Sequence, residues 1–191
     1  MKHVNSIFCI EGLWDNDLRN KTSVQPILDL LERIEHIPYI HKDCATREEF
    51  EFYLKKWVQQ KYKHYTILYL AFHGDHNKIY LGADEYSLDE MAKMLADKCY
   101  NAIIIIASCS TLAIDKRHLK RFLLQTGAVA ICGYKVDVDW MKSTAFELLL
   151  LSILQENEFS GRGIASIEKK TVQMAKMFDK LEFRIVTVKD L

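Results

Sequence analysis

Proline and glycine are scarce in this chain, with two prolines and seven glycines among 191 residues. Flexible linkers and low-complexity segments are rich in such residues, so no linker is visible, and the sequence contains no internal repeat. We therefore expect a single domain over residues 1–191, which is long enough to bury a sizeable hydrophobic core.

No charge of one sign predominates, because lysine plus arginine and aspartate plus glutamate each number 26. Bulk charge therefore gives no reason to expect nucleic acid or an anionic membrane surface as a partner. Long hydrophobic runs are also missing: the longest strongly apolar helical run, residues 146–154, is too short to span a bilayer and contains Glu147. Residues 1–5 lack a signal-peptide pattern, so we expect a cytoplasmic protein.

Cysteine patterns typical of disulfides or metal sites are absent. The five cysteines are odd in number, and no two have C-x-x-C spacing. Cys9 and Cys132 fall within predicted strands, which favours reduced core residues in a cytosol-like compartment. One set of potential metal ligands lies close together in the sequence: His36, His41, Asp43 and Cys44. Their spacing matches no standard zinc site, so we expect neither a metal nor an organic cofactor.

Two apolar runs end in residues that carry chemistry. TILYLAF, residues 66–72, is followed by His73 and Gly74, and AIIIIAS, residues 102–108, is followed by Cys109. Runs of this length and composition are typical of strands buried on both faces of a parallel sheet. A helical stretch between them predicts a crossover connection, so the strands are parallel and their carboxyl ends meet at one edge of the sheet.

The rest of the chain alternates between strand-like and helix-like segments. Further strands are expected at residues 4–10, 38–41, 128–134 and 182–188, and a small hairpin around residues 78–81. Helices are expected at residues 24–35, 46–62, 87–95, 115–125, 143–155 and 163–180. This order predicts an α/β fold whose six-strand, mostly parallel sheet is covered by helices on both faces.

A histidine and a cysteine at neighbouring strand ends favour nucleophilic catalysis. A cysteine nucleophile needs a base or an imidazolium partner to become a thiolate, and it needs donors for the oxyanion that forms on the substrate. His73 supplies the first, and the backbone N–H groups of Gly74 and Cys109 are candidates for the second. His76 is a rival base, although it lies in the following loop.

The motifs LYLAFHG and IIIIASC resemble the histidine and cysteine motifs of the caspase-like cysteine peptidases of clan CD, which include caspases, separase, gingipains and CHAT proteins. Residues 127–137 look like the next strand of that family, and the resemblance extends from residue 4 to about residue 154. It implies the caspase-hemoglobinase fold and cysteine endopeptidase activity on a protein or peptide partner. Bacterial relatives suggest a role in regulated defence or cell death.

The chain departs from the animal caspases in several ways. His73 and Cys109 are 36 positions apart (109 minus 73), against roughly 50 in caspases. Ser108 precedes the cysteine, where caspases have a Gln-Ala pair, and Ser110-Thr111 follow it where many members have a glycine. The chain therefore resembles a compact, divergent member of the family, nearer to the CHAT-like and bacterial caspase-like proteins than to the animal caspases.

Two other classes of function stay open. One is a catalytically inactive caspase-like scaffold that binds a protein partner through the same cleft. The other is a flavodoxin-like regulatory or nucleotide-binding domain, which needs a phosphate-binding loop after the first strand. That position reads Glu-Gly-Leu-Trp, residues 11–14, and its acidity and single glycine argue against a phosphate site.

The resemblance also implies a substrate preference. Residues 133–138 look like the separase pattern Gly-x-x-Trp-Asp-Val, which places Asp137 on the acid that pairs with a basic P1 residue, the residue before the cleaved bond. Asp15 adds negative charge after the first strand, and Trp14 is expected to wall the pocket. We therefore expect cleavage after arginine or lysine.

Other readings of the same residues remain. Asp137 and Asp139 are also typical of turn residues that cap the helix that follows. Arg19 and Lys135 leave an acidic P1 residue open, and a small or apolar P1 residue is a third possibility.

Overall fold

A six-stranded sheet forms the centre of the computed structural model, which describes residues 4–190. Residues 1–3 and 191, which the expected domain includes, lie outside the described residues. In spatial order the strands are β2 (Tyr39–Cys44), β1 (Ile7–Gly12), β3 (Ile67–Ala71), β7 (Ile103–Ala107), β8 (Ala130–Tyr134) and β9 (Phe183–Thr187). All neighbours are parallel except β9, which runs antiparallel to β8 at the edge. The predicted six-strand, mostly parallel sheet is confirmed.

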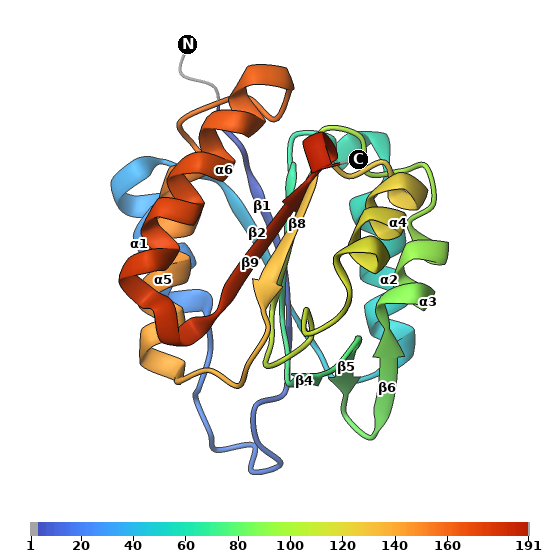
Figure 1. The fold of residues 1–191 in the computed structure, drawn as a ribbon. Helices are drawn as coiled ribbons and strands as arrows, with labels where there is room; N and C mark the ends of the chain where they lie inside the picture. Colours follow the sequence, from blue (N-terminus) through green and yellow to red (C-terminus); the bar gives the residue numbers. More distant parts are fainter. Residues whose placement is uncertain (1–3, 191) are drawn as a thin grey trace.

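Three helices cover each face of this sheet (Figure 1). One layer consists of α1 (Gln25–Glu35), α5 (Trp140–Ile153) and α6 (Gly161–Ala175). The other consists of α2 (Arg47–Trp57), α3 (Leu88–Met94) and α4 (Lys116–Thr126). Because β3 and β7 lie between both layers, every one of their residues is buried, which explains their continuous apolar sequences.

A small second sheet grows from the end of β3. It consists of β4 (Gly74–Asp75), β5 (Lys78–Leu81) and β6 (Asp84–Ser87), and all its pairs are antiparallel. The sequence predicted only a hairpin around β5, because the two-residue β4 carries no periodic pattern of its own. This sheet leads the chain from the histidine to α3.

The helix boundaries follow local capping. The predicted capping box of α2 is present, with the Thr46 hydroxyl accepting from the Glu49 N–H. That helix ends at Trp57 instead of continuing to residue 62, and a 3-10 turn, η1 (Gln60–Tyr62), follows. Helix α5 begins at Trp140, three residues before the predicted start, because the carboxylate of Asp139 caps it by accepting from the Lys142 N–H at 3.0 Å.

The remaining elements are short. The 3-10 segment η2 (Lys176–Leu181) follows α6, which ends earlier than predicted, and η3 (Val188–Asp190) follows the last strand. Within residues 4–190, no helix is both long and apolar enough to cross a membrane.

Candidate active site

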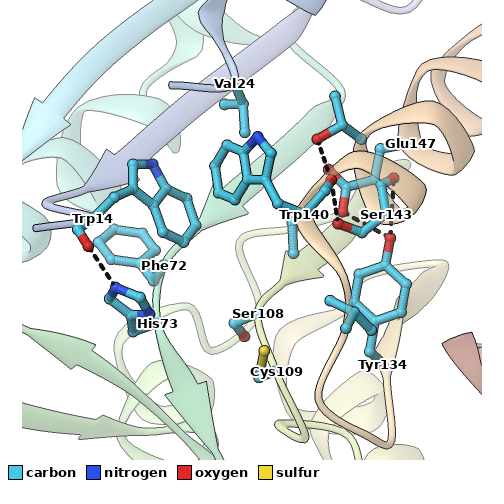
Figure 2. Close-up of a pocket in the computed structure, with 13 residues that line it drawn as sticks. Trp14, Val24, Phe72, His73, Ser108, Cys109, Tyr134, Trp140, Ser143 and Glu147 are labelled. Atoms are coloured by element: carbon cyan, nitrogen blue, oxygen red, sulfur yellow. Dashed lines mark hydrogen bonds between the residues drawn. The ribbon is translucent and has the colours of Figure 1, made fainter. Parts of the chain in front are cut away.

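The register of β3 and β7 brings His73 and Cys109 to one edge of the sheet. Ala71 lies opposite Ala107, so the histidine and the cysteine each follow two residues after the last paired position. Both side chains line the same pocket, which has a volume of about 140 Å³. In Figure 2 the sulfur of Cys109 points into the space between His73 and Tyr134.

His73 is oriented by a backbone carbonyl. Its Nε2 lies 3.0 Å from the carbonyl oxygen of Trp14 (Figure 2). A carbonyl only accepts, so this bond requires the proton on Nε2, and in the neutral ring Nδ1 is the nitrogen with a free lone pair. The Trp14 ring packs edge-on against the His73 ring, with centroids 5.2 Å apart. Both the ring plane and the tautomer are therefore set by the loop after β1.

Cys109 lies in a tight turn that is tied to the next strand. Ser110 adopts a left-handed conformation with φ of 52°, and its N–H donates to the carbonyl of Val136 at 3.1 Å. The Leu112 N–H donates to the carbonyl of Tyr134 at 2.9 Å. All five cysteines are free, and Cys109 is the one that is not buried. The turn thus presents a partly exposed thiol at the mouth of the pocket.

His73 and Cys109 line one pocket but are not hydrogen-bonded to each other. Within residues 4–190 the His73 ring makes its hydrogen bond to Trp14, and no hydrogen bond joins it to Cys109. A space between base and nucleophile is the place where a substrate carbonyl and its leaving group fit.

Two backbone N–H groups close to the cysteine turn lack a hydrogen-bond acceptor among the described residues. The Tyr80 N–H donates to the carbonyl of His73 at 2.9 Å, which makes these two a hydrogen-bonded pair of the small sheet. The alternation of an antiparallel ladder then leaves the N–H of Gly74 unused by β5. The N–H of Cys109 has no acceptor among the described residues. Both donors are thus available to a ligand.

Gly74 is required by its surroundings. A Cβ at this position would lie 2.4 Å from the Thr111 hydroxyl oxygen and 2.8 Å from the Cβ of Ser108. The hydroxyls of Ser108 and Thr111 bond to each other at 2.6 Å, so they cannot move apart without cost. The absence of a side chain lets the histidine segment approach the cysteine turn closely.

Glu11 organises the wall of the site, a role that sequence reasoning missed. Its buried carboxylate accepts from Trp14 Nε1 at 2.5 Å, the Val24 N–H at 2.8 Å, the Ser23 hydroxyl at 2.6 Å and His41 Nε2 at 2.6 Å. Burial alone would raise the pKa of Glu11, but the bonds from His41, Ser23 and Trp14 outweigh it and lower the pKa below its usual value. Glu11 is therefore ionised and fixes the indole of Trp14.

The same cluster includes the one group of potential metal ligands within residues 4–190. Ligand atoms of Glu11, His41 and Asp43 lie within 4.8 Å of one another. His36, which ends α1, is not part of it, and neither is the buried Cys44, whose pKa burial raises to about 12. Because the Glu11 oxygens already accept four donors, a metal ion would have to displace them.

The predicted substrate-binding residues lie in different positions. Trp14 lines the pocket. Asp15 is exposed and accepts from the Asp17 N–H at 2.8 Å, beside a separate shallow depression. Asp137 is exposed and accepts from the Ser110 hydroxyl at 2.8 Å. Asp15 and Asp137 are next in sequence to Trp14 and Val138, which line the pocket, but neither carboxylate is part of the lining. Their role in substrate binding stays a prediction.

His76, the rival base, lies in the turn between β4 and β5. It is exposed, its N–H donates to the carboxylate of Asp75, and it does not line the pocket. Its position keeps its ring out of the space that His73 and Cys109 share.

A second carboxyl group, also missed by sequence reasoning, lies within the pocket. Glu147 of α5 is 4% exposed and lines the pocket together with Cys109. It accepts from the hydroxyl of Tyr134 at 2.7 Å and from that of Tyr69. Burial raises the pKa of Glu147 to about 7, although the two tyrosine bonds act in the opposite direction. The only advance signal was an acidic residue inside an apolar helix.

Two solved structures with the same fold are caspases. The crystal structure of caspase-1 from Spodoptera frugiperda has a TM-score of 0.61 and 13% sequence identity, over 97% of this chain and 89% of that chain. The structure of pro-Sf-caspase-1 has a TM-score of 0.62 and 11% identity, over 97% of this chain and 88% of that chain. At these identities the likeness establishes the fold and not the activity. The expected caspase-type α/β fold is confirmed.

Sequence comparisons add a family. No curated protein matches the chain. The model of a family of unknown function, DUF6642, matches residues 4–186 and so includes every residue of the site described above. The chain has the fold of the caspases and belongs to DUF6642.

Proposed function

We propose that this protein is a cysteine endopeptidase that uses Cys109 as nucleophile and His73 as base. The proposal rests on one observation: Cys109 and His73 follow adjacent parallel strands and line the same pocket. Nε2 of His73 is hydrogen-bonded to the carbonyl of Trp14, which leaves Nδ1 to act as the base. The caspase fold supports a peptidase at a coarse level.

The chemistry runs through the free nitrogen of the ring. Nδ1 of His73 takes the thiol proton of Cys109, and the sulfur attacks the substrate carbonyl carbon to form a C–S bond. The N–H groups of Gly74 and Cys109 hold the oxyanion. The imidazolium then protonates the leaving amine as the C–N bond breaks, which leaves a thioester. Water, deprotonated by the same nitrogen, hydrolyses the thioester and restores the thiol.

The bond from Nε2 to Trp14 serves in place of a third catalytic side chain. Within residues 4–190 no carboxylate contacts the His73 ring, so the carbonyl of Trp14 is the group that orients it. When the ring becomes an imidazolium, the same carbonyl accepts from a cationic donor, which strengthens the bond. Glu11 supports this arrangement by holding the indole of the same residue.

The partner in this proposal is a protein or peptide substrate that lies across the sheet edge. Trp14 lines the pocket, and the exposed Asp15 and Asp137 are each next in sequence to a lining residue, where they add negative charge for a basic substrate. The proposal extends to the setting that the sequence resemblance implies, namely regulated defence or cell death among CHAT-like and bacterial caspase-like proteins.

An unbiased peptide-library digest tests the proposal. The wild type should release new peptide termini, and the Cys109→Ala variant at equal concentration should release none. If neither protein cleaves any peptide while the wild type still binds peptides, the inactive scaffold becomes the better account.

A further inference from the structure

The pocket beside Cys109 is shaped for one long side chain. Its volume of about 140 Å³ is small against the roughly 300–1,000 Å³ of ligand pockets for small molecules. Apolar groups form most of the walls, including Trp14, Phe72, Val138 and Trp140. The Trp14 and Trp140 rings pack edge to face at 4.5 Å between centroids, which makes that wall rigid (Figure 2).

One carboxyl group interrupts this apolar lining. Glu147 is buried and lines the pocket, and among residues 4–190 no lysine, arginine or histidine forms an ion pair with it. Its partners are the hydroxyls of Tyr69 and Tyr134, one on each oxygen. A carboxylate has about four acceptor positions, so acceptor capacity remains after these two bonds. A buried carboxylate without a counter-charge is costly, and a cation that enters the pocket removes that cost.

The cations that would favour an acidic side chain are engaged elsewhere. Lys135 pairs with Glu182 at 2.6 Å, and Arg19 pairs with Asp17 at 2.7 Å on the exposed loop. Neither residue lines the pocket. Among the described residues, the charge-bearing side chains in the lining are Glu147, the proposed base His73 and the proposed nucleophile Cys109.

We propose that this pocket is the S1 pocket and that Glu147, which is buried in its lining, pairs with the terminal cation of a lysine or arginine side chain at P1. The inference rests on the proposed peptidase function for its meaning as a P1 site. The apolar walls contact the aliphatic stem, and the carboxylate contacts the charged end. Neither Asp15 nor Asp137 lines the pocket, so Glu147 is the carboxyl group that a side chain in the pocket meets.

The protonation of Glu147 predicts a pH dependence of cation binding. The titratable groups packed around it are Tyr69 of β3, Tyr134 and Cys132 of β8, and Cys9 of β1, and the same pocket contains His73 and Cys109. Burial raises the pKa of the two tyrosines, Cys132 and Cys9, so these four are neutral near pH 7. Burial also raises the pKa of Glu147 to about 7. Cation binding should therefore strengthen between about pH 6 and about pH 8, as the carboxyl ionises.

The first arm of the test measures binding without catalysis. NMR titrations follow the indole N–H signals of Trp14 and Trp140 as n-butylammonium, n-butanol or butyrate is added. We expect n-butylammonium to bind at least tenfold more tightly than either analogue. Glu147→Gln should remove that preference, while Glu32→Gln, a matched change at an exposed site on α1, should keep it. The wild-type comparison stands even if Glu147→Gln fails to fold, and equal binding of the three compounds would overturn the proposal.

The second arm measures cleavage with fluorogenic peptides that differ only at P1. We expect lysine or arginine to be cleaved at least 100-fold faster than leucine or aspartate, and Glu147→Gln to lose this difference. Cleavage that prefers leucine or aspartate would overturn the pocket assignment and leave the peptidase intact. Cation binding in the first arm without cleavage of any peptide would overturn the peptidase and leave Glu147 as a cation-binding site without a role at P1. If Asp137→Asn abolishes the preference for lysine or arginine and Glu147→Gln keeps it, Asp137 and not Glu147 binds the P1 side chain.

Discussion

The ring of His73 donates from Nε2 to the carbonyl oxygen of Trp14 at 3.0 Å, across 59 positions of sequence. This bond joins the end of β3 to the loop after β1 and leaves Nδ1 as the nitrogen with a free lone pair in the neutral ring. The orientation of the proposed base therefore depends on the loop after β1. The following predictions test that dependence and the chemistry that it supports.

Cys109 should be the first cysteine to react with iodoacetamide near neutral pH. The other four cysteines are buried, and burial raises the pKa of Cys9, Cys44, Cys99 and Cys132. Mass spectrometry of the first adduct on folded protein checks this. A first adduct on Cys44 or Cys99 would contradict the assignment, and full protection of the Cys109 peptide by a bound substrate analogue would support it.

Replacing Glu11 with glutamine should weaken both stability and activity. An amide accepts through only one of its two polar atoms, so at least one of the four donors around residue 11 faces an N–H group. We expect a loss of about 3 kcal/mol in the free energy of unfolding. We also expect a fall in kcat on folded enzyme, because Trp14 no longer has a fixed indole. Unfolding in urea and kinetics below the transition measure the two effects, and unchanged kcat would separate Glu11 from the site.

Gly74→Ala should move the cysteine turn. The new methyl group would overlap with Thr111 and Ser108, at 2.4 Å and 2.8 Å. We expect a loss of about 2 kcal/mol in stability from overpacking and a fall in kcat larger than that in 1/KM, since the Gly74 N–H is displaced from the oxyanion. A variant with wild-type melting temperature and kcat would show that the close approach is not needed.

The pH dependence of stability should report the buried Glu147. Its folded-state pKa of about 7 lies above the ordinary value of 4.5, so the folded state holds the proton more tightly than the unfolded state. Its contribution to stability is full below pH 4.5 and is lost as the pH rises to about 7. Relative to Glu147→Gln, the wild type should lose about 3 kcal/mol across that interval. Urea unfolding of both proteins at several pH values measures the difference, and parallel curves would mean that Glu147 is not buried as described.

The parts of the fold that could be predicted are those with a local signature. The strands that end in His73 and Cys109 are apolar throughout because both faces are covered, and such a run needs no tertiary information to be recognised. The helix start at Trp140 and the two-residue strand β4 were missed. The first depends on one capping side chain, that of Asp139, and the second depends on its pairing with β5, and neither has a periodic sequence pattern. The meeting of the two strand ends at one edge of the sheet could also be predicted, since parallel neighbours end at the same edge.

The supporting groups of the site depend on contacts between distant segments. Nothing in the sequence around Glu11 indicates that its carboxylate accepts four donors, one of them His41 from the neighbouring strand β2. Glu147 stood out as an acid in an apolar helix, but its direction toward Tyr69 and Tyr134 appears only when α5 packs on the sheet. Asp137 was predicted from a pattern of neighbours, and its bond to Ser110 follows from the turn after Cys109.

The most direct test of the account compares kcat/KM for the best library peptide among wild type, Cys109→Ala and His73→Ala. Both residues lie at strand ends outside the packed core, so both variants should keep the circular dichroism spectrum and melting temperature of the wild type. The account predicts a fall of roughly 1,000-fold or more in kcat/KM for each variant. Full cleavage by folded Cys109→Ala would contradict it.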